Sequence, residues 1–281
     1  MAGNSSEPGR SVTSRVLAIF DTFDIAHPTL SLSEIARRAG LPLATAHRLV
    51  AELTEWRGLE RDSDGRYHIG LHLWEVGLLG PLSTRLRNVA LPFLQTLYET
   101  TRENVHLAIR DRWDALYVEK LSGHRSVSII SRVGGRLPMH ATGVGKALLA
   151  YESPEFVRAY LSRPLERPTA YTIVEPGRLH RELAEVRRRG YAVTSEEMTL
   201  GSCSVAAPVL DEGGKPVAAV GLVVHTVRVE PRKLAPPVSA AAEGIAARLA
   251  AARDDPYPGF LHDFTVARRG APAAQAGGGP T

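Results

Sequence analysis

The feature that most constrains the fold is a pair of helices around a tight glycine turn in residues 30–59, LSLSEIARRAGLPLATAHRLVAELTEWRGL. Ser31 or Ser33 can cap the first helix. Gly40 can end it, and Pro42 can begin the second helix. Apolar residues recur every three or four positions and define one inward face: Leu32, Ile35, Ala36, Ala39, Ala46, Leu49, Val50 and Leu53. A short helix, a glycine turn and a longer helix predict a helix-turn-helix.

The segments on either side extend this prediction to a winged helix-turn-helix over residues 12–70. An amphipathic helix is expected over residues 12–25. Residues 58–70, GLERDSDGRYHIG, place two short strands around Asp64-Gly65, and that dipeptide is a strong hairpin signal. Residues 1–11 are expected to form a disordered tail.

This arrangement predicts DNA binding, because the second helix of such a motif enters the major groove. Arg48 can pair with guanine or a phosphate, and Thr45 and His47 can hydrogen bond to either. Arg57 is a further candidate for a backbone contact. The predicted DNA-binding residues are Arg37, Arg38, Leu43, Ala44, Thr45, His47, Arg48 and Arg66. The alternative is a solvated helix with scattered arginines, and the net charge of +4 does not decide between the two.

Beyond residue 70 the pattern predicts a linker helix and a larger α+β domain. Residues 71–101 read as a helix with a break at Gly80-Pro81, which suits an interdomain linker and a dimer contact. Residues 102–253 alternate strands and helices. The strands expected there are 105–110, 115–121, 126–131, 191–197, 204–210 and 216–224, and the helices begin near residues 143, 154, 178 and 234. Residues 254–281 are rich in Gly, Pro and Ala and are expected to be disordered.

One stretch, MHATGVGKALLA at residues 139–150, has the look of a phosphate-binding loop but fails its two tests. The first glycine of G-x-x-x-x-G-K-[ST] falls on His140, and the hydroxyl position falls on Ala147. We therefore expect Lys146 to bind no nucleotide, with its stem along the sheet and its ammonium group at a domain surface. The glycines remain either a turn packed beneath the sheet or the wall of a small-molecule pocket.

Composition excludes several other classes of protein. Cys203 is the only cysteine, so one chain has neither a disulfide framework nor a multi-thiolate metal site. The N-terminus lacks the apolar core of a signal peptide, and no apolar run reaches the length of a membrane span. We expect a soluble, cytoplasmic protein that binds no metal, uses no cofactor and has no membrane contact.

Two motifs together give the chain a family resemblance that covers nearly all of residues 12–252. LPMHATGVGKALLA and RRRGYAVTSEEMTLGSCSVAAPVLDEGGKPVAAVGLVV resemble the IclR family of bacterial transcriptional regulators. The resemblance implies a GAF-like domain with an antiparallel sheet, whose pocket binds a small, often acidic metabolite as effector. It also implies a homodimer or a dimer of dimers on operator DNA.

By the same motif alignment, the effector-binding positions of the family fall on Ser126, Ile129, Gly143, Val144, Thr194, Ser202, Ser204, Gly221 and Val223. Cys203 is expected to point away from them as a buried, inert residue. The main alternative is an enzyme with a winged-helix dimerisation domain. A methyltransferase lacks its glycine-rich cofactor turn here, and GSCSV does not match the G-x-S-x-G elbow of a hydrolase. A regulator, and more specifically an IclR-type repressor, is therefore preferred to an enzyme and to a purely structural DNA-binding protein.

Overall fold

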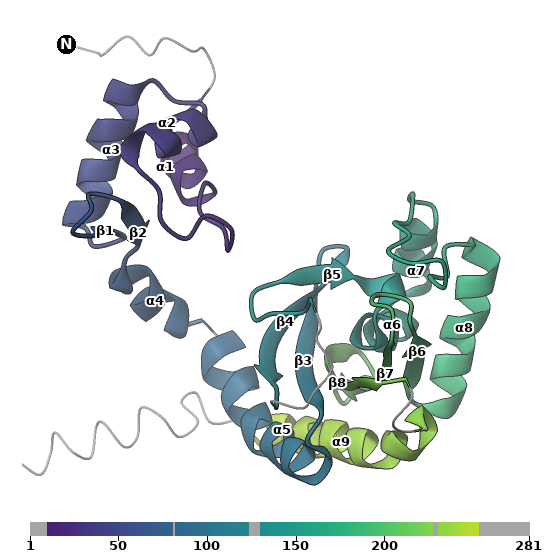
Figure 1. Cartoon of the computed structure of the whole chain (residues 1–281). Coiled ribbons are helices and arrows are strands. Elements are labelled where there is room, and N and C mark those ends of the chain that lie inside the picture. Colours follow the sequence, from purple (N-terminus) through teal and green to yellow (C-terminus); the bar gives the residue numbers. More distant parts are fainter. Residues whose placement is uncertain (1–9, 81, 124–129, 227–229, 253–281) are drawn as a thin grey trace, which may run out of the picture. The chain divides into compact units, whose positions relative to one another are not determined.

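The computed structural model describes residues 10–80, 82–123, 130–226 and 230–252. The chain divides into two compact units, Met1–Gly80 and Pro81–Thr281 (Figure 1). The division falls at the dipeptide where the sequence predicts a break in the linker helix. Each unit is described by itself below.

Unit 1 begins with three helices, α1 (Val12–Phe20), α2 (Leu32–Ala39) and α3 (Leu43–Glu55). Their apolar faces form one core that includes Ile19, Ile35 and Leu49. Helix α1 ends five residues earlier than predicted, since the Thr22 hydroxyl donates to the Ile19 carbonyl at 2.7 Å and occupies an acceptor of the next turn. Arg10 and Ser11, which we assigned to the tail, contact the unit: Arg10 Nη1 donates to Ala39 O at 3.0 Å, and Ser11 caps α1.

The wing is the predicted hairpin, with β1 (Leu59–Arg61) antiparallel to β2 (Tyr67–Ile69). Gly65 has a φ of 78°, which its place in the tight turn requires. Leu30 adds a bridge to the hairpin, because its N–H and C=O bond to Tyr67 at 2.9 Å and 2.7 Å. The wing is therefore joined to the segment before α2 by backbone hydrogen bonds.

The predicted linker helix is divided between the two units. Unit 1 ends with α4 (Leu71–Leu78), and none of its residues is buried. Unit 2 begins with a π-helical turn, η1 (Leu82–Arg87), which runs into α5 (Asn88–Thr101). Pro81 lies outside the described residues.

The centre of unit 2 is one antiparallel sheet. Its strands are β3 (Asn104–Asp111), β4 (Asp114–Leu121), β5 (Arg136–Pro138), β6 (Ala192–Ser195), β7 (Ser202–Leu210) and β8 (Pro216–His225). Their order across the sheet is β5-β4-β3-β8-β7-β6. The strand predicted for residues 126–131 falls mostly on residues 124–129, outside the described part of the chain.

Helices cover both faces of this sheet (Figure 1). On one face, α5 and α9 (Ala235–Ala251, after the 3-10 turn η3, Pro231–Leu234) pack against a cluster that includes Val205, Val220 and Leu222. On the other face, α6 (Gly143–Ala150) lies on the sheet, preceded by the 3-10 turn η2 (Met139–Ala141). Helices α7 (Pro154–Leu161) and α8 (Pro176–Arg189) contribute to the same hydrophobic cluster as α6. The α+β class and the antiparallel sheet are confirmed.

Alternation along the strands explains why both faces need cover. Val205 and Ala207 belong to the cluster beneath α9, whereas Ala206, between them, belongs to the cluster beneath α6. Small residues recur on the α6 side, so the helix can approach the sheet closely. In the described part of the chain, no helix is long and apolar enough to cross a membrane.

Candidate functional site

The helix-turn-helix is built by caps that the sequence encodes. Ser31 and Glu34 form a capping box at the start of α2. Gly40 ends α2 with a φ of 64°, a left-handed conformation that favours glycine. Pro42 then stands immediately before α3. Three residues thus turn the chain between the two helices.

The first two turns of α3 present the surface that the sequence predicts for DNA. Leu43, Ala44, His47 and Arg48 are exposed, and Thr45 is half-buried, while Ala46, Leu49, Val50 and Leu53 are buried. Arg48 Nη1 pairs with Glu52 Oε1 at 2.8 Å, but both side chains are about 60% exposed. An exposed ion pair of this kind contributes little to stability and can be exchanged for another partner.

Two of the predicted arginines already hold the unit together. Arg38 Nε donates to Thr22 O at 3.0 Å, and its Nη2 donates to Asp24 at 2.7 Å. Arg66 Nη2 donates to Thr29 O at 2.9 Å and to Glu34 at 3.0 Å. These bonds connect the α1–α2 loop and the wing to α2.

The remaining two arginines sit differently. Arg37 is exposed on the last turn of α2. Arg57 is exposed with a φ of 62° in the turn between α3 and the wing, where its carbonyl accepts from the backbone N–H of His72. Sequence reasoning did not separate Arg38 and Arg66 from these two, because their partners are far away in the chain.

Unit 2 contains a cavity between the start of α6 and the concave face of the sheet. It holds about 480 Å³ of space between atoms, part of it open to solvent. Seven of the nine predicted effector positions line it: Gly143, Val144, Thr194, Ser202, Ser204, Gly221 and Val223. Ser126 and Ile129, the other two, lie outside the described residues. The positions chosen by the family alignment therefore lie around one cavity, although they come from α6, β6, β7 and β8.

The glycines allow the walls of the cavity to approach each other. A Cβ atom on Gly143 would lie 2.4 Å from Ser204 Oγ, and one on Gly221 would lie 2.8 Å from Val144 Cγ1. A Cβ on Gly145 would lie 2.4 Å from the Met139 carbonyl oxygen. Both glycines of the GVGK stretch are therefore needed for packing, and Gly143 also bounds the cavity.

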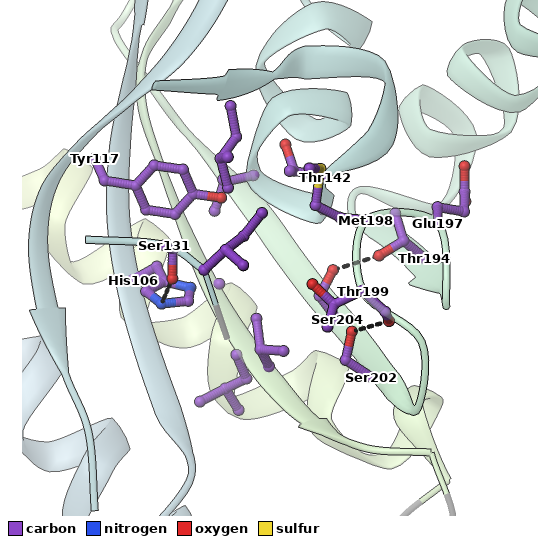
Figure 2. A pocket seen from close by; sticks show the side chains of 17 residues that line it. His106, Tyr117, Ser131, Thr142, Thr194, Glu197, Met198, Thr199, Ser202 and Ser204 are labelled. Atoms are coloured by element: carbon purple, nitrogen blue, oxygen red, sulfur yellow. Dashed lines mark hydrogen bonds between the residues drawn. The ribbon is translucent and has the colours of Figure 1, made fainter. Parts of the chain in front are cut away.

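Hydroxyl groups gather on one side of the cavity (Figure 2). Thr194 Oγ1 and Ser204 Oγ are 2.5 Å apart, and Ser202 Oγ donates to Thr199 O at 2.6 Å. One hydroxyl of the Thr194–Ser204 pair donates to the other. The hydroxyl that accepts this bond can donate its own hydrogen bond to a ligand oxygen. Cys203 is buried between Ser202 and Ser204 in sequence and does not line the cavity, as strand alternation predicts.

A second polar group lies on the opposite side, and sequence reasoning missed it. His106 Nε2 is 2.9 Å from Ser131 Oγ, and the Tyr117 ring meets the His106 ring edge-on at 5.1 Å (Figure 2). Burial, with a smaller effect from the Lys120 charge, lowers the pKa of His106 to about 3, so this imidazole is neutral at pH 7. Burial also raises the pKa of Tyr117 above its usual value. The available signal was strand register, because His106 lies opposite the predicted Gly221 in the β3–β8 pair.

The prediction for Lys146 was wrong in one respect. Its side chain is fully buried rather than at a surface, and Nζ pairs with Glu197 Oε1 at 2.6 Å. Burial lowers the pKa of Lys146, and the neighbouring Glu197 opposes that effect. The ammonium group has no need to reach water, because the counter-charge is inside the unit.

The described lining of the cavity therefore offers neutral hydrogen-bonding groups rather than cations. Glu197 belongs to the lining, yet Figure 2 shows its carboxylate directed away from Ser202 and Ser204. His106 is neutral, and the remaining lining residues are apolar, hydroxyl-bearing or glycine. The cavity can bind a small molecule through hydrogen bonds and apolar contact. Its described lining contains one serine–histidine pair, Ser131 and His106, but the lowered pKa of His106 makes this imidazole a weak general base.

Comparisons with known proteins agree with this division of the chain. The model of the family described as "IclR helix-turn-helix domain" matches residues 12–63, and "Bacterial transcriptional regulator IclR C-terminal" matches residues 82–247. The "Transcriptional repressor IclR" of Escherichia coli (strain K12) is 34% identical over 212 residues, which are 74% of this chain and 77% of that protein. The "HTH-type transcriptional regulator XynR" of the same strain is 33% identical over 223 residues, 79% of this chain and 88% of that protein.

Solved structures give the same result. An IclR homolog from Microbacterium hydrocarbonoxydans, crystallised as a complex with 4-hydroxybenzoate, is 36% identical with a TM-score of 0.83. The match covers 86% of this chain and 100% of that one. Similar proteins of this family are transcriptional regulators, which sets aside the methyltransferase and hydrolase alternatives. The chain belongs to the IclR family of bacterial transcriptional regulators, with an N-terminal DNA-binding domain and a C-terminal effector-binding domain.

Proposed function

We propose that unit 1 reads operator DNA with the exposed surface at the start of α3. Leu43 is 56% exposed there and can contact a thymine methyl group, while Thr45, His47 and Arg48 supply hydrogen bonds. Ala44 leaves room for the backbone to approach a phosphate. The exposed Arg37 contributes a phosphate contact. Arg38 and Arg66 mainly form hydrogen bonds within unit 1, and their exposed atoms contact the DNA backbone.

The test compares the two members of the exposed ion pair. Arg48→Ala is expected to weaken specific operator binding by about 1–3 kcal/mol if Arg48 reads a base. Glu52→Ala is the matched control: it removes the competing partner at 2.8 Å and is expected to leave operator affinity unchanged or stronger. Fluorescence anisotropy on operator DNA, mapped first by footprinting, measures both. Equal affinities for wild type and Arg48→Ala would exclude a base contact by this residue.

The binding site is expected to have near two-fold symmetry, because we propose that the protein acts as a homodimer or a dimer of dimers. The main support is α4, whose residues are mostly apolar although none is buried. Leu71, Trp74, Val76 and Leu79 at this helix are between 46% and 73% exposed. A second copy would cover such a patch, which is unusual on a monomer surface.

The dimer proposal has a direct test. Trp74→Glu is expected to shift the protein toward monomer in sedimentation velocity, whereas Leu17→Glu is a control at an exposed apolar residue of α1. A dimer of unchanged stability in the Trp74 variant would show that α4 is not the interface.

For the effector, we propose a small carboxylic acid with an apolar, preferably aromatic, body. The support is the similarity to a homolog that binds 4-hydroxybenzoate, together with the two polar sides of the cavity. The Thr194–Ser204 hydroxyls and the start of α6 suit a carboxylate. Tyr117 and the His106–Ser131 pair suit a second polar group at the far end of the ligand, and Val144 and Val223 suit the ring between them.

Calorimetry with 4-hydroxybenzoate and benzoate tests the site. Val223 lies half-buried on the cavity wall, so Val223→Trp is expected to fill the cavity and abolish binding while operator affinity without ligand stays at the wild-type value. Ligand binding that survives this substitution would place the effector elsewhere. Absence of binding by the wild type would rule out this effector class.

We propose that the effector controls operator affinity as it does in a repressor. The ligand contacts unit 2, so it acts by favouring one arrangement of the winged domains in the dimer, and the Gly80-Pro81 segment is the covalent connection. Such coupling is typically about 1–3 kcal/mol, which corresponds to a 5- to 150-fold change in operator affinity. Operator DNA should change effector affinity by the same factor. Because its operator would be chromosomal, we place the protein in the bacterial cytoplasm.

A further inference from the structure

The buried Lys146–Glu197 pair connects two walls of the cavity. Lys146 is in α6, three residues after Gly143, and its side chain is 0% exposed. Glu197 follows β6, and its side chain is 7% exposed. One carboxylate oxygen accepts from Lys146 Nζ at 2.6 Å, and the other accepts from the Ile173 backbone N–H at 3.3 Å. Both oxygens of Glu197 are thus used away from the cavity.

Glu197 belongs to a loop, residues 196–201, that bounds the cavity with Met198 and Thr199. The loop closes on itself: the Gly201 N–H donates to Glu196 Oε1 at 2.6 Å, and the Ser202 N–H donates to Thr199 O at 3.2 Å. Thr199 O also accepts from the Ser202 hydroxyl, one of the polar groups of the cavity. A displacement of the loop would therefore move the Ser202 hydroxyl as well.

The charges themselves are a poor explanation for this pair. Removing two charges from water costs several kcal/mol per ion, so replacing a buried pair by apolar residues is often neutral for stability or even stabilising. In this geometry, the ion pair supplies a specific connection between the loop and α6. It joins the loop to the same helix whose first turn forms the opposite wall. The hydroxyls of Thr169 and Thr172 also hold the loop, since they donate to the Glu196 and Glu197 carbonyls at 2.6 Å and 2.7 Å.

We propose that Lys146 is a positioning residue for effector binding: through Glu197 it holds the 196–201 loop against α6, so that Met198, Thr199 and Ser202 meet the ligand in one preset arrangement. The inference rests on the proposed effector site. It assigns a role to the lysine of the GVGK stretch, which has none once the nucleotide hypothesis is rejected. Preset walls raise affinity, because the ligand does not have to order them on binding.

The decisive variant is Lys146→Met/Glu197→Gln, which removes both charges and leaves no unpaired ion. Its matched control is Arg110→Met/Glu152→Gln, which removes another ion pair of unit 2, with Glu152 also 7% exposed and N and O atoms 2.5 Å apart. Neither Arg110 nor Glu152 belongs to the described lining of the cavity. Lys146→Met/Glu197→Leu serves if the first double variant does not fold.

Three measurements separate positioning from stability. Amide hydrogen exchange in residues 196–202, without any ligand, is expected to be at least tenfold faster in the Lys146/Glu197 variant and unchanged in the control. Thermal unfolding of the two double variants is expected to be similar. The Kd for 4-hydroxybenzoate is expected to rise about 10-fold in the Lys146/Glu197 variant alone, equivalent to about 1.4 kcal/mol of ordering.

Wild-type exchange in the loop would overturn the proposal, as would an equal rise in Kd in both double variants. The exchange measurement needs no effector, so it decides whether the pair holds the loop even if the wild type does not bind 4-hydroxybenzoate. Failure of the wild type to bind 4-hydroxybenzoate would count against the proposed effector class alone.

Discussion

Gly143 is the position where the structure gives the sharpest quantitative expectation. A methyl group there would lie 2.4 Å from Ser204 Oγ, 3.2 Å from Ser204 Cβ and 3.4 Å from Ala206 Cβ. Rotating the Ser204 hydroxyl away relieves only the first contact and breaks its 2.5 Å bond to Thr194. Otherwise α6 must move about 1 Å away from β7 to restore ordinary contact distances. A Gly143→Trp variant, the obvious way to fill the cavity, would therefore displace the helix.

We expect Gly143→Ala to destabilise unit 2 by about 1–3 kcal/mol, the usual cost of inserting a methyl group into a packed core. For a unit of this size that corresponds to a fall in Tm of roughly 2–12 °C. Gly177 is the matched control, because it lies in the first turn of α8 and a Cβ there meets nothing within 4 Å. Gly177→Ala is expected to be neutral or stabilising by about 0.4–1 kcal/mol.

Calorimetry of the full chain, with the transition of unit 2 as the readout, measures both substitutions. Adding Ser204→Ala to Gly143→Ala removes the contact at 2.4 Å and should recover part of the loss, with a coupling energy of about 0.5–3 kcal/mol. Strict additivity of the two substitutions would refute the steric explanation. Equal Tm values of unit 2 in the Gly143→Ala and Gly177→Ala variants would also refute it.

Further expectations concern the turn, the wing, a cap and pH. Gly40→Ala should cost unit 1 about 1–2 kcal/mol in denaturant unfolding, since Gly40 has a φ of 64°, and Gly40→Asn should cost less. Arg66→Met should destabilise unit 1 because it removes the bonds to Thr29 and Glu34, whereas Arg37→Met should weaken DNA binding with unchanged stability; the reverse pattern would exchange their roles. Thr142→Ala should cost about 0.5–2 kcal/mol, because Thr142 Oγ1 accepts from the Gly145 N–H at the start of α6. The pKa of His106 is lowered to about 3, so the unfolded chain takes up a proton below pH about 6.5 that the folded chain refuses, and stability should fall as pH drops from about 6.5 toward 3. His106→Asn should flatten that slope in unfolding measurements at several pH values, and an unchanged slope would refute it.

Local signals predicted most of the fold. Gly40, Pro42 and the Asp64-Gly65 dipeptide define the helix-turn-helix and its wing, because each acts within a few residues of its own position. Helix α7 was predicted at its observed start, Pro154, and the structure shows that Ser153 caps it there. The end of α1 was missed, since it depends on the hydroxyl of one residue, Thr22.

The candidate site divides in the same way. The cavity walls that carry sequence motifs were predicted through family resemblance, but His106 and Tyr117 became visible only with the register of β3 and β4. Lys146 was misplaced because its partner, Glu197, is 51 residues away in the chain. Arg66 and Glu34 are likewise joined across 32 residues. Periodicity reports which face of an element is apolar, and it carries no information about such distant partners.

All eight residues of α6 are buried, and this limits where ligand preference can vary. A substitution in that helix affects the packing of the whole unit before it affects a bound molecule. The exchangeable positions are those that border the cavity without supporting the helix, such as Met198, Thr199 and Val223. To retarget this regulator as a sensor for another small molecule, libraries should therefore diversify these positions and keep residues 139–150 constant.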